Sequence, residues 1–392
     1  MRHRRKLLGL ATVPLLALLA FGGGDYARGA AFVIQAAGMQ GPARTVAEWT
    51  TSDLAESEAQ IPWRGGSLRA RLYQPMSDGR PISADSLRAP PSLLVPGVHA
   101  GGIDEPRLIQ FARDVASMGR IVVTAELPDL KNYSITPRTT DMIEDAGLWL
   151  SASSGFAPDG RVALMGISFA GGLAIVAASR PSLAPRIAFV LSFGGHGDLP
   201  RTLRYLCTGH LRNGTTRAPH DYGIAIILLG VADRMVPSAQ VQPLREAILA
   251  FLHASHVYMW DKAQAQIEFA RARTMADSLA EPARTLMQYV NERDVARLGP
   301  LLLPHVAHLG NDDALSPDRS TPKCPVYLLH GTEDNVIPAE ESQLLAETLR
   351  SRGVEVKQLA TPLITHAEVD RSAAALAVWS LVHFWTDLLD EH

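Results

Sequence analysis

The sequence predicts an α/β fold, with a mostly parallel central sheet flanked by helices and an inserted, mostly helical cap. Short runs of nearly continuous apolar residues, typical of strands buried on both faces, recur between segments with helical spacing. Strands that alternate with helices in this way indicate a parallel sheet covered on both sides. The alternation breaks down after about residue 200, where the chain becomes mostly helix-like, and it resumes near residue 321. A helical block inside one alternating pattern indicates an inserted cap.

The length and composition fit this organisation. A chain of 392 residues that is 47% hydrophobic can form one large domain with an insertion. We predict five segments: a signal peptide or membrane anchor (1–30), a lead-in or linker (31–64), the first part of the α/β-core (65–205), the helical cap (206–320) and the second part of the core (321–392).

The first segment has the features of an export signal. A basic head (residues 2–6) precedes an apolar run from Leu7 to Phe21. That run has the length of a signal-peptide core and falls short of the roughly 20 residues that a spanning helix needs. The Arg4–Arg5 pair also resembles a twin-arginine signal. We therefore expect a periplasmic, extracellular or membrane-anchored protein. No A-x-A cleavage motif follows Phe21, so a retained anchor stays open, and a buried N-terminal helix is the alternative to export.

The elements of the core follow one another in a regular order. "SLRARLYQP" (67–75) alternates polar and apolar residues, which predicts an early antiparallel strand. After it we predict a strand that ends in a loop (91–102), a helix (105–119), a strand (120–127), a helix (139–153), a strand (161–168), a helix (168–179) and a strand (186–195). The cap contains three clear helical stretches, at 239–255, 263–279 and 282–299. The core then resumes with a strand and turn (324–338), a helix (339–353), a strand (354–362) and a last helix from about 371 to 389.

Charge and motif content exclude several classes of function. The formal net charge of −3 gives no reason to expect nucleic acid as a partner. The chain has neither an HExxH motif nor paired CxxC motifs, so we predict no metal and no cofactor. Two cysteines, Cys207 and Cys324, exclude a disulfide-rich scaffold. In an exported protein they could be joined at the base of the cap, or both could be buried free thiols.

Ser168 lies where a buried strand is predicted to turn into a helix. Its neighbours in "ALMGISFAGGLAIVAAS" are small, with Gly166 two residues before it and Ala170 two residues after it. Small residues either let a helix pack close to a sheet or allow a sharp turn in which these two positions touch. The strand-to-helix setting favours the sharp turn, known as a nucleophile elbow. Such a turn leaves the serine at the N-terminus of a helix, where backbone N–H groups favour negative charge.

In these residues the chain resembles the α/β-hydrolase superfamily, and the resemblance covers most of residues 65–392 apart from the cap. The usual pentapeptide is G-x-S-x-G, whereas this chain has G-I-S-F-A, with an alanine that is small enough to pack. The resemblance implies a catalytic triad in the chain order Ser, Asp, His. It implies Asp334 in "LLHGTEDNVIP" as the acid and His366 in "ATPLITHAEVD" as the base. A helix-capping aspartate and a surface histidine are the structural alternatives.

The resemblance also implies an oxyanion hole made of two backbone N–H groups. One is the N–H of Phe169, directly after the serine. The other is the N–H of Val98, in the loop that ends the stretch "SLLVPGVHAGG". His99 and His196 are possible pocket residues, although a loop-shaping or structural role is the alternative for each. We expect a structural or pocket-lining role for His330 in the same way.

A second segment copies the acid turn. "IAIILLGVADRMVPSAQ" has an apolar run, Gly230, Asp233 and Pro237 in similar spacing, but it lies inside the predicted cap. We favour Asp334 over Asp233, because His366 follows Asp334 by one helix and one strand.

The predicted function is hydrolysis of a small-molecule carboxylic ester by Ser168, through an acyl-enzyme. Peptidase or amidase activity and acyl transfer to an alcohol use the same triad, so they remain alternatives. Dehalogenase chemistry is disfavoured, because that branch of the superfamily carries an aspartate where this chain has Ser168. A non-catalytic binding protein, anchored through its N-terminus, is the rival from another class. Against it, all three triad residues are present, and inactive relatives commonly lack at least one.

Overall fold

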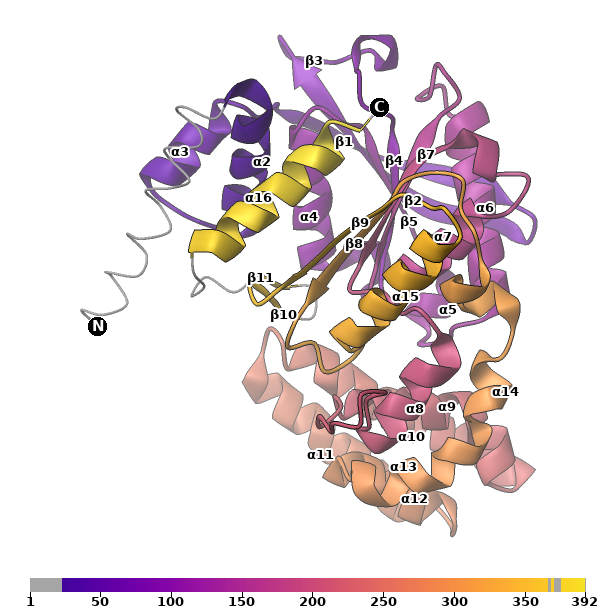
Figure 1. Cartoon of the computed structure of the whole chain (residues 1–392). Helices are drawn as coiled ribbons and strands as arrows, with labels where there is room; N and C mark the ends of the chain where they lie inside the picture. The colour runs from indigo at the N-terminus through magenta and orange to yellow at the C-terminus, as the bar shows by residue number, and fades with distance from the viewer. Residues whose placement is uncertain (1–22, 366–367, 370–374, 392) are drawn as a thin grey trace.

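The computed structural model describes residues 23–365, 368–369 and 375–391. In this part of the chain a large twisted sheet runs through the molecule, with its strands in the order β1-β2-β5-β4-β6-β7-β8-β9 and the short β3 paired to β2 (Figure 1). At one end of the sheet, β1 pairs antiparallel with β2 and β2 pairs antiparallel with β5. The six strands that follow in this order, β5-β4-β6-β7-β8-β9, are parallel. The predicted parallel sheet and the early antiparallel strand are both confirmed.

The strand bounds follow the apolar runs of the sequence closely. The strands of the large sheet are β1 (Leu54–Trp63), β2 (Gly66–Ser77), β3 (Arg80–Pro81), β4 (Ser92–Val95), β5 (Val122–Ala125), β6 (Val162–Ile167), β7 (Ile187–Phe193), β8 (Val326–Gly331) and β9 (Val356–Thr361). A separate pair consists of β10 (Ile364–Thr365) and β11 (Glu368–Val369). Every residue of β4, β5, β7 and β8 is buried, which explains why these strands lack an alternating pattern.

Helices cover both faces of the sheet, and a separate apolar core lies under each face. One face is covered by α2 (Gly23–Ala36), α3 (Pro42–Glu48), α4 (Pro106–Ser117) and α16 (Ala375–Leu389). The opposite face is covered by α6 (Pro137–Ala152), α7 (Phe169–Ala178) and α15 (Ala339–Ser351), and the short α5 (Pro128–Lys131) packs at its edge. The nearly continuous apolar strands place apolar side chains on both faces of the sheet, and the two cores bury them on each side.

The segment predicted as a lead-in or linker contains folded elements. Helices α2 and α3 and the whole of β1 precede the first predicted strand, and α2 begins inside the predicted 1–30 segment. Figure 1 shows α2 beside α16, and the contact is close because Gly29 has no side chain where α16 places Thr386. Phe32 of α2 packs on Trp385, with ring centroids 4.1 Å apart. Helix α2 is therefore packed against α16 as part of the folded core, and the boundary predicted at residue 30 falls inside this helix.

The basic head and the apolar run from Leu7 to Phe21 lie outside the described residues. Over the part of the chain that the structure does describe, no helix combines the length and the apolar character needed to cross a membrane.

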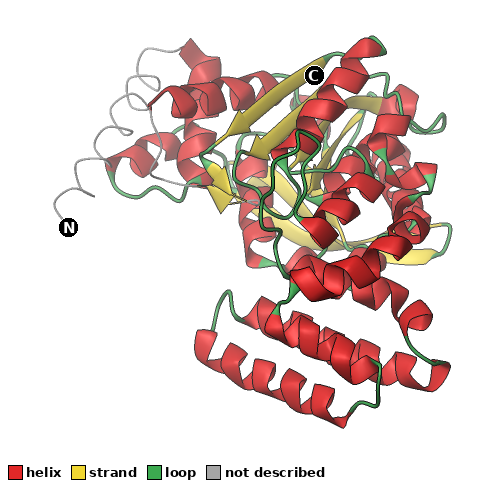
Figure 2. Cartoon of the chain, turned by 60° about the horizontal axis from the view of Figure 1, so that its bottom comes forward, coloured by secondary structure: helices red, strands yellow, loops and turns green. Residues whose placement is uncertain are grey.

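The insertion between β7 and β8 is helical, as predicted, and we call its helices, over residues 199–310, the cap. Its helices are α8 (Leu199–Thr208), α9 (Tyr222–Met235), α10 (Ser238–Val257), α11 (Lys262–Ser278), α12 (Ala283–Glu292), α13 (Val295–Leu302) and α14 (Val306–Gly310). Figure 2 shows them as a layer of helices below the sheet. The apolar run "IAIILLG", which copies a strand in its composition, belongs to α9 and is wholly helical.

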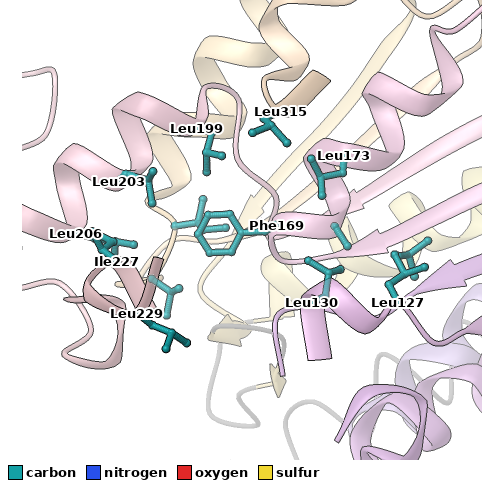
Figure 3. Packing of buried hydrophobic residues seen from close by; sticks show 14 of the residues in the cluster. Leu127, Leu130, Phe169, Leu173, Leu199, Leu203, Leu206, Ile227, Leu229 and Leu315 are labelled. Atoms are coloured by element: carbon teal, nitrogen blue, oxygen red, sulfur yellow. The ribbon is translucent and has the colours of Figure 1, made fainter. Parts of the chain in front are cut away.

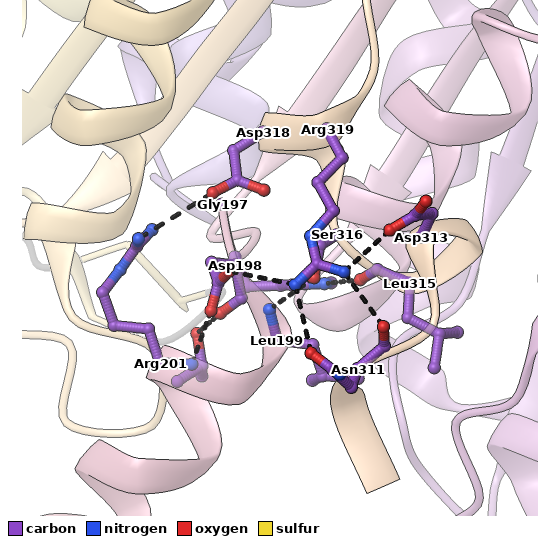
Figure 4. Close-up of polar contacts among 12 residues, drawn as sticks. Gly197, Asp198, Leu199, Arg201, Asn311, Asp313, Leu315, Ser316, Asp318 and Arg319 are labelled. Atoms are coloured by element: carbon purple, nitrogen blue, oxygen red, sulfur yellow. Dashed lines mark hydrogen bonds and ion pairs between the residues drawn. The ribbon is translucent and has the colours of Figure 1, made fainter. Parts of the chain in front are cut away.

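Polar contacts join the segment that enters the cap to the segment that leaves it (Figure 4). The N–H of Asp318 donates to the carbonyl of Gly197 at 3.0 Å, and the N–H of Leu199 donates to Ser316 Oγ at 3.0 Å. Cys207 and Cys324, on either side of this junction, are both buried free thiols. The cap is thus fixed at its base by hydrogen bonds and not by a disulfide.

Candidate active site

The backbone at Ser168 turns sharply between β6 and α7. Ser168 has φ 55° and ψ −136°, in a region that residues with a side chain rarely occupy, and it is the residue before the first turn of α7. Its N–H donates to the carbonyl of Phe193 at 2.7 Å, and its own carbonyl accepts from Gly171 N–H at 2.8 Å. Such a conformation costs of order 1–3 kcal/mol and persists only when its surroundings fix it. Ser168 therefore lies in the strained turn that the sequence predicted.

Small neighbours make this turn possible. A Cβ at Gly166 would overlap the carbonyl group of Ala170, so the positions two before and two after the serine do touch. A Cβ at Gly97, in the loop after β4, would lie 3.2 Å from the Cβ of Ser168. The loop after β4 therefore passes directly beside the serine.

The contact between Gly166 and Ala170 gives a stability prediction. Gly166→Ala is expected to lower the free energy of unfolding by about 1–3 kcal/mol, because the added methyl group has no space and the turn must open. Urea unfolding followed by circular dichroism measures this change.

Gly230→Ala is the matched control, since Gly230 lies in α9 and its nearest neighbour is the flexible end of Leu309. This control is expected to change stability by less than about 1 kcal/mol. Equal stability of Gly166→Ala and the unchanged protein would contradict the steric requirement.

Asp334 is held in the turn that follows β8. Its carboxylate is buried, with 1% of the residue exposed. Its Oδ1 accepts from the N–H of Val336 at 2.8 Å and from the N–H of Ile337 at 3.0 Å, and its Oδ2 lies 3.5 Å from Nε2 of His330. Backbone N–H bonds to a carboxylate favour its charged form. The turn therefore presents a buried, oriented carboxylate at the same sheet edge as Ser168, because β6 and β8 are both parallel strands.

His366 lies outside the described residues, between β10, which ends at Thr365, and β11, which begins at Glu368. After the Asp334 turn the chain passes through α15, β9 and β10, and His366 follows β10 directly. Its part in the triad stays a prediction.

Asp233, the alternative to Asp334, lies away from the cavity beside Ser168. It lies in the last turn of α9, it is exposed, and it does not line the cavity beside Ser168. The two aspartates are similar in sequence but not in structure, because the apolar run before Asp233 is helical whereas the run before Asp334 is the strand β8.

A cavity of about 530 Å³ lies between the sheet edge and the cap. Ser168, Val98 and His99 line it from the core, together with Asn335 and Val336 of the acid turn. The cap and the adjoining loops contribute most of the remaining walls, through Tyr133, His220, Asp221, Tyr222, Leu252, Ser255, His256, Tyr258, Met259, Phe269 and Arg293. A concave site with a few convergent polar groups is the usual form of a small-molecule site.

The two predicted oxyanion residues differ in what their side chains do. Val98 lines the cavity. The N–H of Phe169 is at the first position of α7, where a helix has no internal acceptor for it. The Phe169 ring points away into an apolar cluster of leucines from α8, α9 and the core (Figure 3). That cluster anchors the backbone beside Ser168 to the cap.

Of the two roles left open for His196, the structure supports the structural one and not the pocket-lining one. His196 is fully buried and absent from the cavity wall; its Nε2 lies 2.7 Å from the carbonyl of Leu315. Its ring packs against Phe169, with centroids 5.4 Å apart. His330 is equally buried, and its Nε2 lies 2.7 Å from the carbonyl of Ile337. Both residues have structural roles, His330 in the acid turn itself.

Several cavity residues have no signal in the sequence. Tyr133 has a left-handed backbone, with φ 57°, and burial raises the pKa of its hydroxyl to about 12. Arg293 of the cap forms an ion pair with Asp221 at 2.6 Å, which places two opposite charges side by side in the cavity wall. These residues come from separate segments that meet only in the folded chain.

In the residues that the structure describes, no group of three or more His, Cys, Asp or Glu side chains is arranged to hold a metal ion.

The strand order and the turn at Ser168 together define the α/β-hydrolase fold. No family model and no curated protein matches the chain. Among solved structures, an esterase from Pyrobaculum calidifontis is similar at 14% identity and a TM-score of 0.45, over 92% of this chain and 91% of that one. A thermostable esterase from Pseudomonas putida is similar at 15% identity and a TM-score of 0.47, over 98% and 97% of the two chains. A carboxylesterase cloned from a metagenomic library has 17% identity and a TM-score of 0.44, over 85% and 90%.

Proposed function

We propose that the chain is a serine hydrolase that cleaves carboxylic esters of small molecules through an acyl-enzyme. The observation that carries the proposal is Ser168, held in a strained turn at the N-terminus of α7 and lining a cavity of about 530 Å³ beneath the cap. Backbone N–H groups at this place favour the negative charge that develops on a carbonyl oxygen under attack.

The proposed reaction has two halves. Ser168 Oγ attacks the ester carbonyl carbon while His366 takes the hydroxyl proton, and the carbonyl oxygen becomes an oxyanion. The C–O bond to the alcohol then breaks, and His366 returns the proton to the leaving alkoxide. A water molecule attacks the acyl-enzyme by the same path and releases the acid and the serine.

The remaining residues stabilise charge or geometry. Asp334 keeps one tautomer of His366 and stabilises the imidazolium that forms. The N–H groups of Val98 and Phe169 donate to the oxyanion. Removal of one such donor typically costs about 3 kcal/mol of transition-state stabilisation.

We also propose that the protein is exported, or anchored in a membrane by its N-terminus. The basic head and the apolar run up to Phe21 support this proposal. Fractionation of cells that express the full chain tests it, and recovery of the unprocessed protein only from the cytoplasm would contradict it.

A series of p-nitrophenyl esters with acyl chains of rising length, run beside a panel of peptide anilides, tests the proposed reaction. We expect hydrolysis of the esters, with kcat/KM passing through a maximum at the chain length that fills the cavity and falling for longer chains. Faster cleavage of the anilides would favour the amidase alternative. No turnover of either set by the folded protein would favour the non-catalytic alternative.

A further inference from the structure

A chain of hydrogen bonds joins the cap to the loop that follows β4. The N–H of Gly101 donates to Nδ1 of His99 at 3.1 Å, and Nε2 of His99 lies 3.0 Å from Nδ1 of His256. The two rings meet at 77°, with centroids 4.5 Å apart. His256 belongs to the last turn of α10, in the cap, and both histidines line the cavity beside Ser168.

The donor at one end of this chain fixes the protons of both rings. The Gly101 N–H can only donate, so His99 Nδ1 is an acceptor, and neutral His99 carries its proton on Nε2. That proton is donated to His256 Nδ1, so neutral His256 carries its own proton on Nε2. A proton added to either Nδ1 would face another N–H at about 3 Å, and the chain of hydrogen bonds would break.

The loop that His99 shapes is the one that passes the serine. Val98 precedes His99 directly, and Gly97 is so close to Ser168 that an added Cβ would lie 3.2 Å from the serine Cβ. A Cβ at Gly101 would lie 3.0 Å from His99 Nδ1, so the loop is folded tightly round the ring. The His99 ring is therefore packed against, and hydrogen-bonded to, the same short loop that carries the peptide group of Val98.

We propose that His256 is a positioning residue: through His99 it holds the 97–101 loop with the Val98 N–H directed at the substrate oxygen, and so makes the oxyanion hole depend on the contact between the cap and this loop. The expected effect of His256 on turnover rests on the proposed function. Its expected effect on the 97–101 loop does not require that function. A second contact, from Arg107 Nη2 to Met259 Sδ at 3.7 Å, joins the cap to α4 nearby, but it involves no residue of the loop.

The surroundings keep both histidines neutral. Burial lowers the pKa of His99 to about 4, with a further lowering from His256. Burial also lowers the pKa of His256, and His253 on the same helix lowers it further. At the start of α4, Glu105 opposes these shifts and Arg107 adds to them. The cavity wall also contains His220, Asp221 and Arg293, of which Arg293 and Asp221 form an ion pair.

The sign of the pH dependence follows from these directions. An unfolded histidine binds a proton below about pH 6.5, whereas folded His99 binds one only below about pH 4. The unfolded state therefore holds more protons between these values, so the pair contributes its full stability above about pH 6.5 and loses it as the pH falls towards 4.

Two substitutions of His256 separate positioning from packing. His256→Leu fills similar space but removes the acceptor for His99 Nε2–H. His256→Asn places Oδ1 where the ring has Nδ1, and so keeps an acceptor. We expect kcat for a p-nitrophenyl ester to fall about tenfold in His256→Leu, with KM changed less than threefold; this is smaller than the roughly 10²–10³-fold cost of removing an oxyanion donor outright. His256→Asn is expected to stay within about threefold of the unchanged protein. His308→Ala, at an exposed histidine of α14 that does not line the cavity, is the control and should leave kcat unchanged.

Hydrogen exchange reports on the loop without any turnover. Peptides that cover residues 97–104 are expected to exchange faster in His256→Leu and at the original rate in His256→Asn. Unchanged exchange in His256→Leu, or equal losses of kcat in the Leu and Asn variants, would overturn the proposal. The two proposals can also fail separately. If exchange is faster in His256→Leu but the unchanged protein cleaves no ester, the proposed function is overturned and the contact between cap and loop is supported.

The unchanged protein provides a test if His256→Leu fails to fold. Nitrogen-15 NMR of the histidine rings is expected to show both residues as neutral Nε2–H tautomers at pH 7, with His99 titrating near pH 4. A protonated His99 at pH 7, or its Nδ1–H tautomer, would overturn the proposal.

Discussion

Replacement of Ser168 by alanine is expected to abolish ester hydrolysis, with kcat lowered at least about 10⁴-fold. The change removes the only group in the proposal that forms a covalent bond to the substrate, and the oxyanion donors and the cavity then supply only residual catalysis. Steady-state rates with a p-nitrophenyl ester measure the loss. A fluorophosphonate probe, which reacts with activated serines, is expected to label the unchanged protein and not Ser168→Ala.

Ser179 offers a matched control. It lies at the opposite end of the same helix, α7, where its hydroxyl donates to the carbonyl of Ile175 at 2.8 Å. Ser179→Ala should retain both turnover and labelling, and circular dichroism should show both variants folded. Labelling of Ser168→Ala by the probe would place the nucleophile elsewhere. Absence of labelling in the folded, unchanged protein would favour the non-catalytic alternative.

The central sheet was predictable because its strands are buried on both faces. β4, β5, β7 and β8 have no exposed residue, so each appears in the sequence as a short apolar run. β1 was missed because it is an edge strand with exposed acidic residues and pairs only with β2. The helix α2 was missed because its apolar residues follow directly on a signal-like segment, and its place in the core is shown by its packing against α16 through Gly29 and Phe32.

The turn at Ser168 was predictable for a different reason: the small residues that it needs are close to the serine in the sequence. The small residues at 166 and 170 lie within two positions of the serine, and their contact follows from the turn itself. His196 could not be placed from sequence, because a position just beyond a strand end leaves open whether the ring faces the cavity or the adjacent helix. The pairing of His99 with His256 joins residues 157 positions apart across the cap, and no local pattern marks it.

The two aspartates in similar sequence segments, Asp334 and Asp233, allow a direct comparison within one chain. Asp334→Asn is expected to lower kcat by about 10⁴-fold, the size of the effect of the same exchange in serine proteases, because the neutral amide no longer stabilises the imidazolium or selects the correct tautomer. Asparagine is nearly the same size, and its Oδ1 can still accept the N–H groups of Val336 and Ile337. The turn should therefore persist, with a small change in the free energy of unfolding relative to the change in kcat.

Asp233→Asn provides the matched comparison, because Asp233 lies in a segment with similar spacing of Gly, Asp and Pro but is exposed on α9, away from the cavity. Its kcat is expected to stay within about twofold of the unchanged protein, since a charge on the surface is screened by water and salt. Parallel measurements of kcat and of urea unfolding for the two variants separate catalysis from stability. Loss of turnover in Asp233→Asn with activity retained in Asp334→Asn would reverse the assignment, and comparable activity in both would show that neither carboxylate acts on the base.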